Sequence, residues 1–425
     1  MLIKMLFMLK RLNISSYFMV DLKNDIKVFI DKILKKNVKY QLAIIDSKFP
    51  SQKPLGFRNN EINFLLDNVK DSTAYCMYPI SIGPKSMFSQ TYGKSYQEFK
   101  YCLKKYSKYY KNHKRKIEYL PKRLHKKLVY CYFLSETYTL LPYLNKNKLP
   151  FVFVLFPGGM FGIDNESSDE MLKEIFSSPY FKKVIITEFI TKKYLLEKKF
   201  CEEDRIEEIY TGYPSFTKEE VEKEQKLYYP KDKDTIDLTF CAFKYSPMGY
   251  DKGYDLFIDT AMRLAPKYPQ LRFHVIGSFD ENDIDVSEIR DKIKFYGVLQ
   301  KEELKKIYLK TDMFITPNRP SALYKGNFDG FPMHGTSIYW GCTILNTDEY
   351  KTNIHFKDKE EVVIIRPEIN DICEKVEYLI NNMDKTYEIG KNGKNRYYML
   401  FNNEKRDILL KNLINNIFED TNKEE

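Results

Sequence analysis

Short apolar runs recur along the whole chain, and helical patterns or loops separate them. In the first half they include QLAIID at residues 41–46, FVFVLFPGG at 151–159 and KVIITEF at 183–189. The second half continues with TIDLTFCAF at 235–243 and LRFHVIGSF at 271–279. Buried strands that alternate with helices are typical of parallel sheets covered on both faces. The sequence therefore predicts an α/β fold with two Rossmann-like, doubly wound domains in tandem.

A charged, proline-containing stretch at residues 215–237 separates the two series of runs. Its composition leaves little to bury, which is typical of a connection between domains. We expect a first domain over residues 1–220, a second over 236–398, and a C-terminal helix and tail over 399–425. Because open α/β sheets bind ligands beyond the carboxyl ends of their strands, we expect the functional loops around a central cleft between the domains.

Cysteine spacing and hydrophobicity exclude several other classes of protein. The 7 cysteines are scattered, with no Cys-x-x-Cys pair and no histidine at metal-ligand spacing. This pattern argues against a disulfide framework and against a structural metal site. No apolar run approaches the roughly 20 residues that span a bilayer. The apolar and basic N-terminal segment MLIKMLFMLKRLN predicts a helix, with weak association with a membrane surface as the alternative.

Much of the net charge of +10 lies in residues 101–128, where aromatic residues stand among lysines and arginines. A solvated helical face is the simplest interpretation, and it also places His113 and His125 in solvent. The alternative is a surface for phosphates, whether on nucleic acid, anionic lipid or nucleotide-linked substrates.

Two lysines flank the loop that follows the first strand of the second domain. Lys244 and Lys252 lie on either side of Pro247 and Gly249, and Gly253 lets the chain enter the next helix. Two ammonium groups beside a helix N-terminus suit a diphosphate, because the cations and the helix dipole act together. Two solvated lysines are the alternative.

A glycine-rich turn with one acid, NFDGFPMHGTSIYWG at residues 327–341, follows the apolar run MFITP. Main-chain N–H groups at a helix start bind a phosphate or a sugar hydroxyl. Asp329 is an acceptor for sugar hydroxyls, with a helix cap as the alternative role. His334 titrates near neutrality and is able to donate to a phosphate. The candidate main-chain donors of this turn are Gly330, Phe331, Met333, His334 and Gly335.

Further glycines follow strands in each half. Gly158 and Gly159 end the run FVFVLFPGG and let a ligand approach the main chain, with a structural turn as the alternative. Gly277 follows the strand HVI, where it either turns the chain or approaches a bound base. His274, within that strand, is expected to be a core or sheet-face residue and not a catalyst.

Taken together, the motifs of the second half resemble those of the retaining GT-B glycosyltransferases of family 4 (group 1). The similarity runs through DLTFCAFKYSPMGYDKGYDLFIDTAMRLAPKYPQLRFHVIG, FYGVLQKEELKKIYLKTDMFITP and FDGFPMHGTSIYWGCTILNTD, in the family's order. The first half resembles the family's acceptor domain only in its alternation and in the stretch VIITEFITKKYLLEKKF. The resemblance implies the GT-B fold, with an N-terminal acceptor-binding domain, a C-terminal nucleotide-sugar-binding domain and a C-terminal helix that crosses back to the first.

The resemblance also implies roles for single residues. Lys244 falls where the family has a basic residue on the donor diphosphate, Lys252 matches the lysine of its Lys-Gly pair, and Asp329 is the first acid of its E-x7-E motif. These three residues form the expected catalytic group. The family's second glutamate, which holds the donor ribose, is replaced by a hydroxyl, because Thr336 occupies its position and Ser337 follows. The expected donor-binding set is Lys244, Lys252, Gly277, Asp329, Gly330, Phe331, Met333, His334, Gly335, Thr336 and Ser337, and the expected acceptor set in the cleft is Gly158 and Gly159.

The function that the resemblance implies is a cytoplasmic, hexosyltransferase-type enzyme. It would move a sugar from a UDP- or GDP-linked donor to a glycan, lipid-linked or protein acceptor, with retention of configuration. We expect no metal and no cofactor, because the lysines and helix amides stabilise the leaving diphosphate. Peripheral contact with the inner face of a membrane is an additional expectation, and no specific nucleic acid partner is expected. The alternative, favoured by Thr336, is a catalytically degenerate GT-B protein that binds a glycan or partners a second glycosyltransferase.

Overall fold

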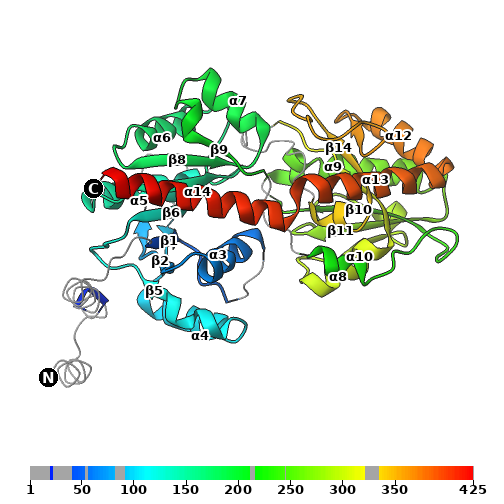
Figure 1. Ribbon diagram of the computed structural model, residues 1–425. Coiled ribbons are helices and arrows are strands. Elements are labelled where there is room, and N and C mark those ends of the chain that lie inside the picture. The colour runs from blue at the N-terminus through cyan, green and yellow to red at the C-terminus, as the bar shows by residue number, and fades with distance from the viewer. Residues whose placement is uncertain are drawn as a thin grey trace.

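The computed structural model describes residues 20–22, 41–52, 56–81, 91–210, 216–244, 246–320 and 335–424. Two parallel sheets, one of 7 strands and one of 6, form the centres of two α/β units. Figure 1 shows helices packed around each sheet, with the first sheet on the left and the second on the right. The predicted fold class, two Rossmann-like doubly wound domains, is confirmed.

The first sheet is parallel in every strand pair. Its strands, in spatial order, are β5 (Ile117–Tyr119), β2 (Thr73–Cys76), β1 (Leu42–Asp46), β6 (Leu128–Tyr132), β7 (Phe151–Leu155), β8 (Phe181–Ile186) and β9 (Ile206–Glu208). The helices that accompany it are α3 (Phe57–Asn68), α4 (Tyr96–Tyr106), α5 (Leu134–Lys146), α6 (Glu166–Phe176) and α7 (Phe189–Glu197). Smaller elements are the antiparallel pair β3 (Ile80–Ser81) and β4 (Thr91–Tyr92), and the 3₁₀ helices η1 (Lys111–Lys116) and η2 (Glu203–Arg205).

The second sheet is also parallel in every strand pair. Its strands, in spatial order, are β12 (Ile293–Phe295), β11 (Leu271–Gly277), β10 (Ile236–Ala242), β13 (Thr311–Thr316), β14 (Thr343–Thr347) and β15 (Val363–Ile365). The accompanying helices are α8 (Lys218–Glu222), α9 (Tyr254–Leu264), α10 (Lys301–Lys310), α11 (Gly335–Tyr339), α12 (Ile369–Asn381) and α13 (Met383–Phe401), with the 3₁₀ helices η3 (Pro247–Lys252) and η4 (Ser287–Ile289).

Alternate side chains of the strands enter hydrophobic clusters on opposite faces of each sheet. In β1, Ala43 and Ile45 belong to one cluster, whereas Leu42 and Ile44 belong to the other. All four are fully buried. A strand that is buried on both faces needs apolar residues at most positions, which explains why the sequence shows nearly continuous apolar runs and not alternation.

The last helix, α14 (Asn403–Glu424), returns from the second sheet to the first, as Figure 1 shows in red. Arg406 is buried and donates to the Glu61 carboxylate, to the main-chain oxygen of Ile209 at 3.2 Å and to that of Tyr210 at 3.3 Å. The apolar residues of α14 that join a hydrophobic cluster with β1 are Leu410, Leu413, Ile414, Ile417 and Phe418. The expected crossing helix is confirmed.

The basic segment at residues 101–128 is not the continuous helical face that its composition suggested. Helix α4 ends at Tyr106, the 3₁₀ helix η1 follows, and the chain then enters the edge strand β5. His113 is buried, which corrects the expectation that it is solvated. Its Nε2 lies 2.6 Å from Asp67 Oδ1 and its Nδ1 lies 3.1 Å from Asn63 Oδ1, so the imidazole joins η1 to α3.

The charged connection before the second sheet also buries more than its composition suggested. Phe216 packs edge-on against Trp340, with ring centroids 5.0 Å apart. The Nζ of Lys226 donates to the main-chain oxygen of Thr311 at 2.6 Å. Val221 is buried as well. These contacts attach the described part of the connection to the second sheet.

Candidate functional site

The carboxyl ends of β10, β11 and β13 lead into three loops at one edge of the second sheet. Gly277 has a φ of 122°, and a Cβ atom there would lie 1.7 Å from the main-chain oxygen of Ala242. Gly253 has a φ of 68°, and a Cβ atom there would lie 2.0 Å from the main-chain oxygen of Pro317. Only glycine permits these approaches, so both positions hold the three loops close together.

Lys244 is held by the loop that follows β11. Its main-chain N–H donates to Ser278 Oγ at 2.8 Å, and its Nζ lies 2.7 Å from Asp283 Oδ1. The side chains of Lys244 and Asp283 are 34% and 13% exposed, so solvent reaches the ion pair. An anionic ligand that approached this ammonium group would compete with the Asp283 carboxylate.

Lys252 is the last residue of η3, on the connection from β10 to α9 that also carries Lys244. Two buried side chains shape this connection: Ser246 Oγ donates to Asp251 Oδ1, and the main-chain N–H of Asp251 donates back to Ser246 Oγ at 3.2 Å. The structure thus places both predicted lysines on the connection between β10 and α9, at the carboxyl edge of the sheet.

Arg319 was not identified in the sequence, although it follows strand β13 by only three residues. Its guanidinium binds Asp255 at two points, Nη1 to Oδ1 at 2.7 Å and Nη2 to Oδ2 at 2.8 Å. The group also lies 4.1 Å from the ring centroid of Tyr250, and the main-chain N–H of Arg319 donates to the oxygen of Asp251 at 3.0 Å. Arg319 therefore ties the exit of β13 to η3 and to the first turn of α9.

Residues 327–334 of the glycine-rich turn lie outside the described residues, and with them Asp329, Gly330, Phe331, Met333 and His334. The described chain resumes in α11, which begins with Gly335 and Thr336. Ser337 follows and is buried within the structure. The donor contacts expected of these residues stay predictions.

The two glycines predicted for the acceptor differ in their surroundings. Gly158 has a φ of 86°, and a Cβ atom there would meet nothing within 4 Å. Gly159 has a φ of 56°, and its Cβ would lie 2.6 Å from the Phe133 ring. The oxygen of Gly159 accepts a hydrogen bond from the main-chain N–H of Ser135 at 3.0 Å. Gly159 therefore serves the packing of the loop after β7, while Gly158 leaves open space beside the main chain.

A buried ionic cluster joins the carboxyl ends of β1 and β6, and no local pattern in the sequence marks it. Arg58 Nη1 lies 2.8 Å from Asp46 Oδ2 and 3.0 Å from Glu136 Oε1, and its guanidinium stacks 4.5 Å from the Phe133 ring centroid. Burial raises the pKa of Glu136, and the neighbouring Asp46 raises it further. The cluster brings two carboxylates to the edge of the first sheet, where the sequence suggested no acidic or basic group.

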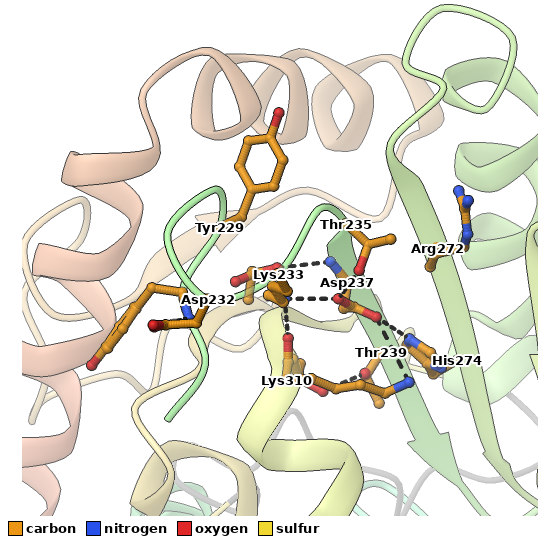
Figure 2. A network of polar contacts seen from close by, with 12 residues as sticks. Tyr229, Asp232, Lys233, Thr235, Asp237, Thr239, Arg272, His274 and Lys310 are labelled. Atoms are coloured by element: carbon orange, nitrogen blue, oxygen red, sulfur yellow. Dashed lines mark hydrogen bonds and ion pairs between the residues drawn. The ribbon is translucent and has the colours of Figure 1, made fainter. Parts of the chain in front are cut away.

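A second polar network lies at the amino ends of β10 and β13, on the edge opposite to Lys244 (Figure 2). Lys233 Nζ lies 2.7 Å from Asp237 Oδ2 and 2.6 Å from Asp312 Oδ2. His274 Nε2 lies 2.6 Å from Asp237 Oδ1, and its Nδ1 lies 2.8 Å from the Tyr296 hydroxyl. Burial lowers the pKa of His274, so the neutral imidazole donates from Nε2 and accepts at Nδ1. The expectation that His274 is a core residue is confirmed.

The ranges given above contain neither a cluster of metal-ligating residues nor a helix of membrane-spanning character. No group of three or more His, Cys, Asp or Glu residues within these ranges could hold a metal ion. None of the helices described there combines the length and the hydropathy that a bilayer crossing requires.

Residues 239–396 match the family model of the glycosyl transferases group 1. Among solved structures, the chain is similar to Alr3699/HepE from Anabaena in complex with UDP, with a TM-score of 0.62, 13% identity, and coverage of 88% of this chain and 100% of that chain. It is also similar to sucrose-phosphate synthase from Thermosynechococcus elongatus, with a TM-score of 0.59, 12% identity, and coverage of 90% and 100%. A glycosyltransferase from Rickettsia africae has a TM-score of 0.56, 14% identity, and coverage of 91% and 99%. No curated protein matches the sequence.

These similarities confirm two expectations. The match to the group 1 model covers the second half, where the sequence motifs placed the resemblance. The structural likeness extends over both sheets and shows the GT-B fold.

Proposed function

We propose that this chain is a glycosyltransferase that moves a sugar from a nucleotide-linked donor to an acceptor hydroxyl. The observation that supports this most is the position of Lys244 and Lys252, which lie within the range that matches the group 1 family and at the carboxyl edge of the second sheet. Open α/β sheets bind their ligands at this edge. The UDP and UDP-glucose complexes of Alr3699/HepE favour a uridine nucleotide as the donor, with GDP as the alternative.

In the proposed reaction, negative charge grows on the diphosphate as the bond between the sugar carbon and the leaving phosphate oxygen breaks. The ammonium groups of Lys244 and Lys252 stabilise this charge. They do so effectively because they are bound to the diphosphate before the bond opens and need not move as the charge develops. The diphosphate replaces Asp283 as the partner of Lys244. Arg319 is a positioning residue that fixes the start of the loop carrying Asp329, whose carboxylate accepts hydrogen bonds from the donor sugar.

Retention of configuration follows if the acceptor attacks on the face from which the phosphate leaves. The acceptor oxygen bonds to the sugar carbon, and the leaving phosphate takes the acceptor proton, so the step requires neither a protein base nor a metal. The acceptor, a glycan, lipid-linked molecule or protein, binds to the first domain at residues 1–220, where Gly158 offers open space beside the main chain.

The direct test is turnover with a panel of UDP- and GDP-linked sugars, read as release of the nucleoside diphosphate. Lys244→Ala and Lys252→Ala should each lower kcat/KM about 10- to 100-fold, the range for losing a hydrogen bond to a charged group. The matched control is Lys267→Ala, because Lys267 is also paired with a carboxylate, Glu377, but follows α9 and lies away from the proposed site. Equal activity of all three variants would remove the assignment of the two lysines.

A second candidate is a degenerate GT-B protein that binds a glycan or another glycosyltransferase. Two observations favour it. Thr336 stands where the family has the carboxylate that binds the donor ribose, and the ammonium group of Lys244 already forms an ion pair with Asp283. Calorimetry with UDP and GDP separates the two candidates, since the degenerate protein would bind neither nucleotide.

A further inference from the structure

A series of exposed basic side chains, with no acidic residue among them, lies along α4 and η1, beside the edge strand β5. Residues 100–115 contain no acidic residue. The exposed cations of this stretch are Lys100, Lys104, Lys108, Lys111, Lys114 and Arg115. None of these six forms an ion pair with any part of the chain that the structure describes, whereas Lys244 and Lys233 are both paired with carboxylates. We refer to these six side chains as the basic surface.

Two tyrosines stand among the cations with their rings open to solvent. Tyr101 is 50% exposed, and Tyr109, at 65%, is the most exposed large apolar or aromatic side chain in the described ranges. Lys105 Nζ lies 5.5 Å from the ring centroid of Tyr101. Tyrosine suits a boundary between water and an apolar phase, because its ring is apolar and its hydroxyl is polar.

The elements that carry the basic surface are firmly packed beneath it. A capping box between Ser95 and Glu98 begins α4, and the inward-facing Phe99 and Tyr106 are buried in the core of the first sheet. His113 fixes η1 to α3 through Asn63 and Asp67, as described above. The cations are therefore presented by an ordered surface and not by a loose tail.

Residues 20–22, the described part of the chain before β1, contact the loop that follows β5. Asp21 Oδ1 accepts a hydrogen bond from the main-chain N–H of Lys122 at 2.7 Å, and Lys122 lies in the loop that follows β5. The sequence before residue 20 begins MLIKMLFMLKRLN, which contains apolar residues and three cations but no acid. A nucleic acid backbone would attract only the cations of this sequence. An anionic bilayer would attract the cations and would also take up its apolar side chains.

We propose that the basic surface docks the protein on an anionic lipid bilayer, with Tyr101 and Tyr109 at the level of the headgroups. Each lysine near an anionic leaflet contributes to binding, and the contribution falls off within a Debye length. The proposal does not depend on the glycosyl transfer proposed above, since the surface lies on the first sheet and contains none of the residues assigned to the donor.

The test is co-sedimentation of the full chain with vesicles of phosphatidylcholine alone and of phosphatidylcholine with about 30 mol % phosphatidylglycerol. We expect binding to the anionic vesicles only, and release when the salt concentration rises from about 0.1 M to about 0.5 M. The triple variant Lys104→Glu/Lys108→Glu/Lys111→Glu should bind about 100-fold more weakly. Tyr101→Ser/Tyr109→Ser should weaken binding less and leave its salt dependence unchanged.

The matched control is Lys231→Glu/Lys306→Glu/Lys391→Glu. These three lysines are exposed, lie outside the basic surface and form no ion pair among the described residues. Both triple variants change the net charge equally, so the control should keep wild-type binding to the anionic vesicles. An equal loss in both variants, full binding by the first variant, or tighter binding to duplex DNA than to the vesicles at about 0.15 M salt would overturn the proposal. Thermal unfolding of each variant checks that the fold is retained.

Discussion

The two edges of the second sheet carry the same kinds of charged side chains in different environments. At the amino edge, the side chains of Lys233, Asp237 and Asp312 are at most 9% exposed and are bonded to one another. At the carboxyl edge, Lys244 is 34% exposed and, within the described ranges, forms an ion pair with Asp283 alone. Lysine–aspartate distances of 2.6 to 2.7 Å occur at both edges, so distance does not distinguish them. Burial does, because a buried ion pair is expensive to break and a solvated one exchanges partners easily.

The largest effect is expected at the amino edge. Lys233→Ala removes the cation that lies nearest to two buried carboxylates, leaves Asp237 with Lys310 at 3.9 Å, and should lower the free energy of unfolding by about 3–5 kcal/mol. Trp340 is the single tryptophan and is buried beside the second sheet, so its fluorescence during urea unfolding reports on this half of the chain. Lys231→Ala, at an exposed position two residues away, should change stability by less than about 0.5 kcal/mol. Equal stability of the two variants would show that the network does not stabilise the fold.

The carboxyl edge should behave in the opposite way. Lys244→Ala removes a partly solvated ion pair and should change the free energy of unfolding by less than about 1 kcal/mol. Its affinity for UDP, measured by calorimetry, should nevertheless fall about 10- to 100-fold, because the diphosphate loses a charged donor. A loss of stability as large as that of Lys233→Ala would erase the distinction between the two edges.

Acid should weaken the amino edge specifically. Burial lowers the pKa of His274, so the folded chain favours the neutral imidazole. The unfolded histidine titrates near pH 6.5, so the contribution of the neutral imidazole to stability is complete above that pH and is lost as the pH drops below it. Hydrogen bonding to His274 and the charge of Lys233 lower the pKa of Asp237, so its own contribution is lost only at more acidic pH. His274→Gln should flatten the pH dependence between about pH 7 and 5, whereas His125→Gln, at an exposed position, should not.

The smallest effect concerns the partner of Lys244. Asp283→Asn removes the carboxylate that competes with a bound diphosphate, so the affinity for UDP should rise, by up to about fivefold. Asp348→Asn provides a control in which a carboxylate of another loop is neutralised. Weaker UDP binding by Asp283→Asn would mean that Asp283 orients Lys244 for the ligand and does not compete with it.

The sequence was sufficient to predict the parts of the fold that depend on local patterns. Largely apolar runs predicted the strands β1, β7, β10 and β11, because strands buried on both faces are mostly apolar; Asp237 in β10 and His274 in β11 are polar exceptions. Leu256, Phe257, Ala261 and Leu264 recur in the sequence at the spacing of one helix face, and all four are buried in α9. The resemblance to the group 1 glycosyltransferases likewise rested on short motifs, whose residues are neighbours in the sequence.

The contacts that the sequence could not indicate join residues that are far apart in the chain. Arg58, Asp46 and Glu136 meet only because β1 and β6 are neighbours in the sheet. Lys233 lies in a stretch whose charges suggested solvation, yet it is buried between Asp237 and Asp312. In each case the burial of a charged residue depends on the arrangement of the strands and not on local composition.

A crystal structure of the chain with UDP tests the central claim most directly. We predict that the diphosphate lies at the carboxyl edge of the second sheet, that the 2.7 Å contact between Lys244 Nζ and Asp283 is broken, and that both lysines of the β10–α9 loop contact phosphate oxygens. A nucleotide bound elsewhere, with the Lys244–Asp283 pair intact, would contradict the account.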